Sequence, residues 1–86
     1  MDIDFTKVFN KQFDKLPRKK QQQARDAVAL FIQDVTAAPL CNHGLKGEWL
    51  GYRSISAGGD LRLHYQSVAE DKVLFVAVGS HSQLYK

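Results

Sequence analysis

Three histidines are the residues of this sequence best suited to acid–base chemistry. Imidazole titrates nearest to neutrality, which makes it the commonest general acid or base in enzymes. His43, His64 and His81 are about 20 residues apart, without the closely spaced ligand pairs of zinc sites, so the sequence predicts no metal site. Only the fold could bring them together, and a histidine taken alone is more often a surface or edge residue than a catalytic one.

Basic side chains form a second group that could bind a polyanion. Residues 7–25 contain Asp14 as their only acid, in a chain with a net charge of +3. The basic residues of this segment are Lys7, Lys11, Lys15, Arg18, Lys19, Lys20 and Arg25. Such a run is often only the solvated face of a helix, but it also favours a nucleic-acid partner.

The first 40 residues predict a strand followed by two helices. Residues 2–5 alternate acidic and apolar side chains, as in a half-buried strand. Thr6 can cap a helix whose apolar stripe includes Phe9, Phe13 and Leu16. The spacing of apolar residues then predicts a second helix.

This second helix is expected to have Pro17 in its first turn and to continue to about Ala37, because Pro39 cannot extend the helical hydrogen-bond ladder. Arg18, Lys19 and Lys20 would then lie at its N-terminus, where the helix dipole makes cations unfavourable by a few tenths of a kcal/mol or more each. That local cost favours a binding role without establishing one.

The second half predicts strands separated by glycines. The candidates are residues 52–57, 61–66 and 72–78, with a hairpin turn at Gly58 and Gly59. The expected fold is therefore α+β: one domain over residues 1–86, with an antiparallel-rich sheet of four or five strands and two N-terminal helices packed on one face.

Composition excludes several classes of protein. Cys41 is the only cysteine, so an intrachain disulfide is impossible and the disulfide-stapled secreted scaffolds are excluded. No segment has the apolar run of a signal peptide or of a membrane span. We therefore expect a cytoplasmic protein without a membrane partner.

Three segments resemble motifs of one protein family. Residues 43–53 read HGLKGEWLGYR, residues 58–65 read GGDLRLHY, and residues 78–85 read VGSHSQLY. Together they resemble the RelE/YafQ superfamily of bacterial toxins, and most closely its YafQ branch. The order of the predicted elements over the whole chain fits the same RelE-like fold.

The resemblance implies a toxin of a type II toxin–antitoxin system that cuts mRNA on the ribosome and is neutralised by a cognate antitoxin. Such an mRNA interferase uses neither a metal nor a cofactor. The 2′-hydroxyl of the RNA attacks the neighbouring phosphate, which requires a base, an acid for the departing 5′-oxygen and positive donors around the phosphoryl oxygens.

The family's active-site positions are matched by His43, Asp60, His81 and Tyr85. The resemblance implies that His81 is the general acid, that His43 and Asp60 activate the 2′-hydroxyl, and that Tyr85 stacks on or orients a base; the acid and base roles could be exchanged. Arg62 is the first candidate for the phosphate clamp.

Further basic residues are assigned to RNA binding. They are Arg53, which is the second candidate for the clamp, and Lys46, Arg18, Lys19 and Lys20. One position departs from the family: Ser56 stands where YafQ-like toxins have a second histidine, and a hydroxyl cannot exchange protons near neutrality as imidazole does. His64 aligns with an apolar position of the family, although it shares a strand face with Arg62.

Two alternative functions remain open. A ParE-like toxin of the same fold would inhibit DNA gyrase by binding and would need no histidine and aspartate set. A catalytically dead relative, which Ser56 suggests, would act only as a binding module. Cleavage of a test message on programmed ribosomes distinguishes the three.

Overall fold

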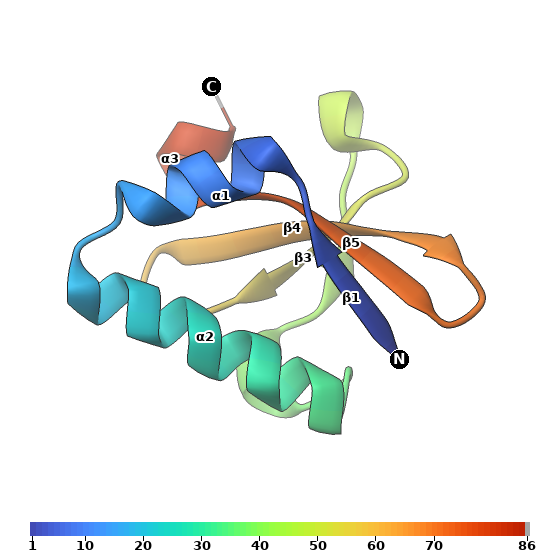
Figure 1. Cartoon of the computed structure of the whole chain (residues 1–86). Helices are drawn as coiled ribbons and strands as arrows, with labels where there is room; N and C mark the ends of the chain where they lie inside the picture. Colours follow the sequence, from blue (N-terminus) through green and yellow to red (C-terminus); the bar gives the residue numbers. More distant parts are fainter. Residues whose placement is uncertain (86) are drawn as a thin grey trace.

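The computed structural model describes residues 1–85 and contains a five-stranded mixed sheet with the strand order β1-β5-β4-β3-β2 (Figure 1). The strands are β1 (Asp2–Phe5), β2 (His43–Gly44), β3 (Arg53–Ser56), β4 (Leu61–Ala69) and β5 (Lys72–Ser80). β1 runs parallel to β5, and the other neighbours are antiparallel. The predicted α+β class with an antiparallel-rich sheet is confirmed.

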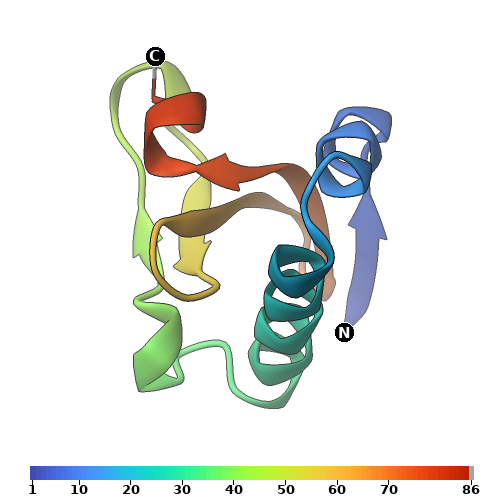
Figure 2. The same cartoon turned by 90° about the vertical axis from the view of Figure 1, so that its left-hand side faces the viewer.

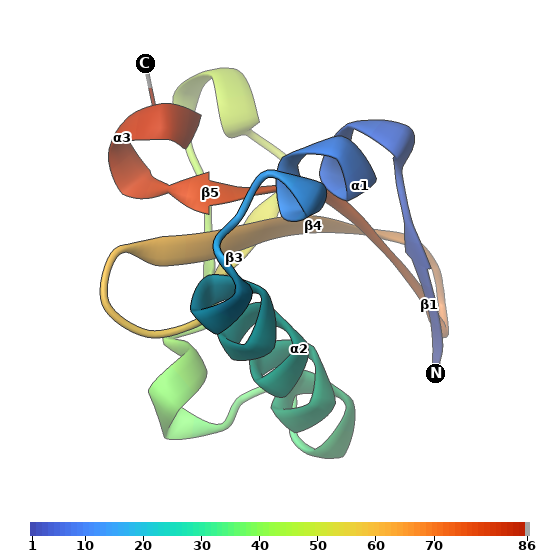
Figure 3. The ribbon, with the colours of Figure 1, turned by 60° about the vertical axis from the view of Figure 1, so that its left-hand side comes forward.

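Two helices follow β1 and lie on one side of the sheet, α1 (Lys7–Asp14) and α2 (Arg18–Gln33) (Figures 1 and 3). The predicted cap of α1 is present, because the Thr6 side chain accepts a hydrogen bond of 3.0 Å from the backbone N–H of Phe9. Pro17 is the N-cap of α2 and so lies one residue before the predicted first turn. Among the described residues, no helix is long and apolar enough to cross a membrane.

The expected end of the second helix at about Ala37 is wrong. α2 ends at Gln33, and Asp34 has an extended backbone. The Asp34 carboxylate accepts hydrogen bonds from the backbone N–H of Thr36 at 3.0 Å and from its hydroxyl at 2.9 Å. This local turn competes with helical geometry, and a short 3₁₀ helix, Ala38–Leu40, follows.

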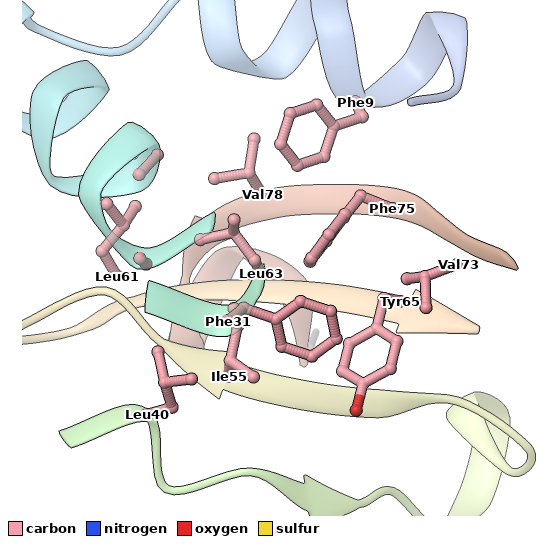
Figure 4. Close-up of a cluster of buried hydrophobic side chains, with 12 residues drawn as sticks. Phe9, Phe31, Leu40, Ile55, Leu61, Leu63, Tyr65, Val73, Phe75 and Val78 are labelled. Atoms are coloured by element: carbon pink, nitrogen blue, oxygen red, sulfur yellow. The ribbon is translucent and has the colours of Figure 1, made fainter. Parts of the chain in front are cut away.

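The core lies between the helices and one face of the sheet (Figure 4). Phe31 of α2 packs edge-on against Tyr65 and Phe75, with ring centroids 4.9 and 5.5 Å apart. Ile55 and Leu63 are fully buried and paired across β3 and β4. Because side chains alternate along a strand, the residues between these core positions point to the opposite face.

That opposite face is flanked by two short elements. They are α3 (His81–Leu84) and a 3₁₀ turn (Gly47–Trp49). Both lie on the side of the molecule away from α2 (Figure 2). The indole Nε1–H of Trp49 donates to the carbonyl of Leu84 at 3.0 Å, so the 3₁₀ turn is joined to α3.

The predicted hairpin turn between β3 and β4 is confirmed. Gly58 and Gly59 have φ angles of +101° and +54°, which favour glycine. A Cβ added at Gly58 would lie 3.3 Å from the side-chain amide nitrogen of Gln23 in α2. The hairpin turn therefore lies beside the N-terminal half of α2.

Candidate active site

A row of polar residues crosses the face of the sheet opposite to α2. His43 pairs with Ser54, and Ser54 pairs with His64, so that the three residues occupy adjacent positions on β2, β3 and β4. Residues directly opposite each other on antiparallel strands point to the same face. The sheet therefore brings together two histidines that are far apart in the sequence.

His43 is exposed and held in one tautomer. Its Nδ1 lies 2.8 Å from the backbone carbonyl of Cys41. A carbonyl only accepts hydrogen bonds, so Nδ1 has the hydrogen and the neutral ring has a free lone pair on Nε2. In this tautomer, Nε2 can accept a proton and so can act as a general base.

Asp60 holds the segment that contains His81. The backbone N–H of His81 donates to the carbonyl of Asp60 at 3.1 Å and to its carboxylate Oδ1 at 3.3 Å. A capping box between Ser80 and Gln83 fixes the same turn. Asp60 thus accepts hydrogen bonds from the backbone of His81, and these bonds can position the start of α3.

The ring of His81 remains available to a substrate. His81 is exposed at the start of α3, and its ring centroid lies 4.3 Å from that of Tyr85. The two planes are inclined by 31°, so Tyr85 supports one side of the imidazole. The family positions His81 and Tyr85 thus form one unit at the C-terminal end of the described chain.

His64 contradicts the expectation of a surface or edge histidine, whereas His43 and His81 fit it. His64 is completely buried, with ring centroids 4.4 Å from Trp49 and 5.3 Å from Tyr85. Burial of the ring, and to a smaller extent its electrostatic interaction with His43 and His81, lowers the pKa of His64 to about 4. His64 is therefore neutral near pH 7, and both exposed histidines lie within electrostatic range of it.

Within the described residues, neither ring nitrogen of His64 has a hydrogen-bond partner. The same is true of the buried hydroxyl of Ser54, its neighbour in the row. Buried polar groups without partners cost about 1 to 3 kcal/mol each. Ser54 was not predicted as a site residue. Its spacing of two residues from Ser56 could have indicated it, because the two side chains then share a strand face.

We predict that His64 makes the protein sensitive to acid. The unfolded chain takes up a proton on this histidine near pH 6.5, whereas the folded chain does so only near pH 4. Unfolding is therefore not favoured by protonation of His64 above pH 6.5, whereas the free energy of unfolding decreases as the pH falls from 6.5 towards 4, by a total of about 3 kcal/mol. Replacing His64 with Leu should remove this loss and should raise stability at neutral pH, because no polar ring is then buried.

Urea unfolding at several pH values from 4 to 7.5 measures the difference in unfolding free energy between wild type and His64→Leu. The matched control is His81→Gln, which removes an exposed histidine and should retain most of the acid sensitivity. If His64→Leu loses stability in acid as steeply as wild type does, another group is responsible.

Arg62 is anchored on the β3–β4 hairpin. Its Nη1 donates to the hydroxyl of Ser56 at 3.2 Å and to the carbonyls of Gly59 and Leu61 at 2.9 and 3.0 Å. In the described part of the chain the bonds of this side chain all use Nη1, so the Nε and Nη2 edge keeps the donor geometry that can bind a phosphate or carboxylate. Ser56, at the position of the family's second histidine, thus serves as a ligand that orients Arg62.

Arg53 is not brought to the same place as Arg62. It pairs with Tyr65, a core residue, and therefore points to the helix-bearing face of the sheet. There its Nε donates to the side-chain oxygen of Asn42 at 2.9 Å. The alternation of the strand therefore directs Arg53 away from the histidines. Its role as a second phosphate clamp stays a prediction that this geometry does not favour.

The remaining predicted RNA-binding residues are exposed. Lys46 precedes the 3₁₀ turn that contains Trp49. Arg18, Lys19 and Lys20 form the first turn of α2, near the β3–β4 hairpin. Their contact with RNA stays a prediction.

Trp49 and Tyr52 pack together, with ring centroids 5.4 Å apart and ring planes nearly perpendicular. Gly47, with a φ angle of +65°, begins the turn before them. Within residues 1–85, no three His, Cys, Asp or Glu side chains lie close enough to hold a metal ion.

The comparisons with known proteins agree with one another. Residues 1–86 match the family model described as a bacterial toxin of a type II toxin–antitoxin system, YafQ. No curated protein sequence matches the chain significantly.

Solved structures of toxins have the same fold. The chain is 26% identical to YafQ in the DinJ–YafQ complex of Escherichia coli, with a TM-score of 0.77 and coverage of 99% of this chain and 98% of the other. A copper-bound mutant toxin from Helicobacter pylori is 28% identical, with a TM-score of 0.77 and 99% coverage of both chains. A YoeB/ParE toxin from Agrobacterium tumefaciens is 16% identical, with a TM-score of 0.76 and coverage of 94% and 99%, and shows the fold alone.

Proposed function

Because the chain belongs to the YafQ family of toxins of type II toxin–antitoxin systems, we propose that it is a ribosome-dependent endoribonuclease that cleaves mRNA in the cytoplasm. Its partners would be the ribosome, the mRNA and a cognate antitoxin that neutralises it. The E. coli relative in complex with DinJ supports a protein partner of the antitoxin kind.

The observation that carries this proposal is the arrangement of two exposed histidines around the buried His64, with a half-buried arginine on the same strand face. His43 and His81 both act electrostatically on His64, and Arg62 lies two residues before His64 on the same strand face. Acid–base cleavage of RNA needs two proton carriers and a cation near one phosphate. A toxin that only bound DNA gyrase would need none of the three.

In the proposed mechanism, the free Nε2 of His43 accepts the proton of the 2′-hydroxyl as its oxygen attacks phosphorus. The bond from phosphorus to the 5′-oxygen breaks, and protonated His81 donates a proton to that oxygen. The products are a 2′,3′-cyclic phosphate and a 5′-hydroxyl. Arg62 donates hydrogen bonds to the phosphoryl oxygens, where negative charge increases in the transition state.

Two further residues act by positioning in this scheme. The hydrogen bonds from the backbone of His81 to Asp60 fix the start of α3. Tyr85 supports the ring of His81 and offers a surface for an RNA base. The proposal thus gives Asp60 a positioning role in place of a share in the proton transfer.

We predict strong cleavage of an mRNA placed on ribosomes and weak cleavage of the same RNA without them, by a factor of about 10² or more. A chain of 86 residues offers little concave surface to orient a flexible strand, so the ribosome has to hold the RNA in line. Single-turnover assays on programmed ribosomes and on free RNA measure the ratio, and added antitoxin should abolish both activities.

Each alternative gives a different result in these assays. Equally efficient cutting of free RNA would make the protein an ordinary ribonuclease. Inhibition of gyrase without RNA cleavage would indicate a ParE-like toxin. Binding to ribosomes without cleavage would indicate a catalytically dead module.

A further inference from the structure

A hollow beside α3 is not used by the proposed mechanism. It has a volume of about 310 Å³ and is lined by Glu48, Trp49, Tyr52 and Leu84. In Figure 3, α3 and the turn that contains Glu48 and Trp49 lie close together, in agreement with the hydrogen bond from Trp49 to Leu84. The volume is at the small end for a ligand pocket and fits one planar group.

The hollow is connected to the candidate active site through packed rings. Trp49 contacts His64, His64 contacts Tyr85, and Tyr85 contacts His81. Leu84 is also the direct neighbour of Tyr85 in the chain. A group bound in the hollow would therefore belong to a nucleotide that flanks the cleaved bond.

The lining combines aromatic rings with one carboxylate. Trp49 and Tyr52 are half-buried and present aromatic surface to an unstacked RNA base. Glu48 is exposed at the rim. In a chain with a net charge of +3, a carboxylate beside bound RNA repels phosphate, and this repulsion is offset if the carboxylate accepts hydrogen bonds from a base.

The chemistry of Glu48 selects among the bases. A carboxylate only accepts hydrogen bonds and can accept two in parallel. Guanine presents two adjacent donors on its Watson–Crick edge, N1–H and the 2-amino group. Adenine and cytosine present one amino group beside an acceptor, and uracil presents one imino N–H between two carbonyls.

We propose that this hollow is a guanine site, in which the base stacks on the Trp49 ring, meets the perpendicular Tyr52 ring at its edge and donates two hydrogen bonds to the Glu48 carboxylate. The inference rests on the proposed function, since it specifies the RNA that the active site prefers. Leu84 closes the apolar side of the site.

The single tryptophan of the chain makes the site directly measurable. Because Trp49 is the only tryptophan, quenching of its fluorescence reports base stacking in the hollow. We would titrate the free protein with GMP, AMP, CMP and UMP. A bidentate contact discriminates between bases by roughly 5- to 150-fold, so GMP should quench at a concentration at least about fivefold lower than the others.

Glu48→Gln tests the carboxylate. This variant should bind the four nucleotides with affinities within about twofold of one another. Its amide has only one acceptor oxygen, so it cannot accept two parallel hydrogen bonds from guanine as a carboxylate does. The matched control is Glu70→Gln, the same change at an exposed carboxylate on the turn between β4 and β5, which should retain the preference for GMP. Circular dichroism checks that both variants fold.

Three outcomes would overturn the guanine site: no quenching by any nucleotide, equal quenching by all four, or a GMP preference that survives in Glu48→Gln. Cleavage assays keep this failure apart from failure of the proposed function. On programmed ribosomes, the ratio of cleavage rates at guanine-flanked and adenine-flanked bonds should fall at least about fivefold in Glu48→Gln. GMP binding without any cleavage would support the guanine site and refute the proposed ribonuclease function. Cleavage without a Glu48-dependent preference would support the ribonuclease function and refute the guanine site.

Discussion

Replacing His81 with Ala should lower the rate of single-turnover cleavage on programmed ribosomes by about 10²- to 10⁴-fold. A positioned acid contributes this much when the departing 5′-oxygen would otherwise leave as an unprotonated alkoxide. The fold should survive the change, because His81 is exposed and its hydrogen bonds to Asp60 come from the backbone. Thermal unfolding, measured on the same preparation, checks this.

The control for His81→Ala is Ser82→Ala, which changes the next exposed residue of α3 and should cut at nearly the wild-type rate. The pH dependence of cleavage gives a second readout, since removal of a general acid abolishes the decline in rate at high pH that its deprotonation causes. A folded His81→Ala protein that cuts within about threefold of wild type would contradict the acid role. His43 would then have to account for both proton transfers.

Most of the fold could be predicted because its elements are long enough to show a period. The apolar stripe of α1 and the cap at Thr6 follow directly from the residues, and the strands β4 and β5 alternate or are continuously apolar. β2 has only two residues and α3 only four. Elements this short show no period, and their existence depends on pairing with β3 and on the capping box at Ser80.

The candidate site was less predictable because cross-strand neighbours depend on register. The family motif marks His43 and His81, but it gives no reason to expect a buried imidazole between them. His64 is buried because Trp49 and Tyr85, from two other parts of the chain, both pack against it. The alternation of side chains along β4 predicts which residues point to the same face of the sheet. It does not predict which other parts of the chain cover that face.

The two arginines of the sheet show how the strand face of a residue can be predicted from the sequence. Arg62 and Arg53 have the same side chain and lie on neighbouring strands, yet they point to opposite faces. Arg53 and Ile55 are two residues apart in the sequence, so on one strand they point to the same face. Because Ile55 is apolar, this spacing already assigns Arg53 to the face of the core. Strand alternation is therefore enough to separate Arg53 from the face that holds the histidines and Arg62.

Arg62→Ala should reduce single-turnover cleavage by about 10²- to 10³-fold, the cost of removing one preorganised donor to a charged transition state. Unlike His81→Ala, it should also weaken binding to the ribosome–mRNA complex, because a phosphate contact is lost. The slope of log affinity against log salt should then fall by about 1. Rates at saturating ribosome and affinities at several salt concentrations separate the two effects.

Two companion variants test the anchoring of Arg62. Arg62→Lys keeps the charge, but its single ammonium nitrogen cannot both bond Ser56, Gly59 and Leu61, as Nη1 does, and present a second donor edge to phosphate. It should therefore restore the salt slope without restoring the rate. Ser56→Ala removes one of three anchors and should cost only about 2- to 10-fold in rate. If Ser56→Ala is as damaging as Arg62→Ala, the hydroxyl has a larger role than orientation. If Arg62→Ala changes neither rate nor salt dependence, the guanidinium does not contact the reacting phosphate.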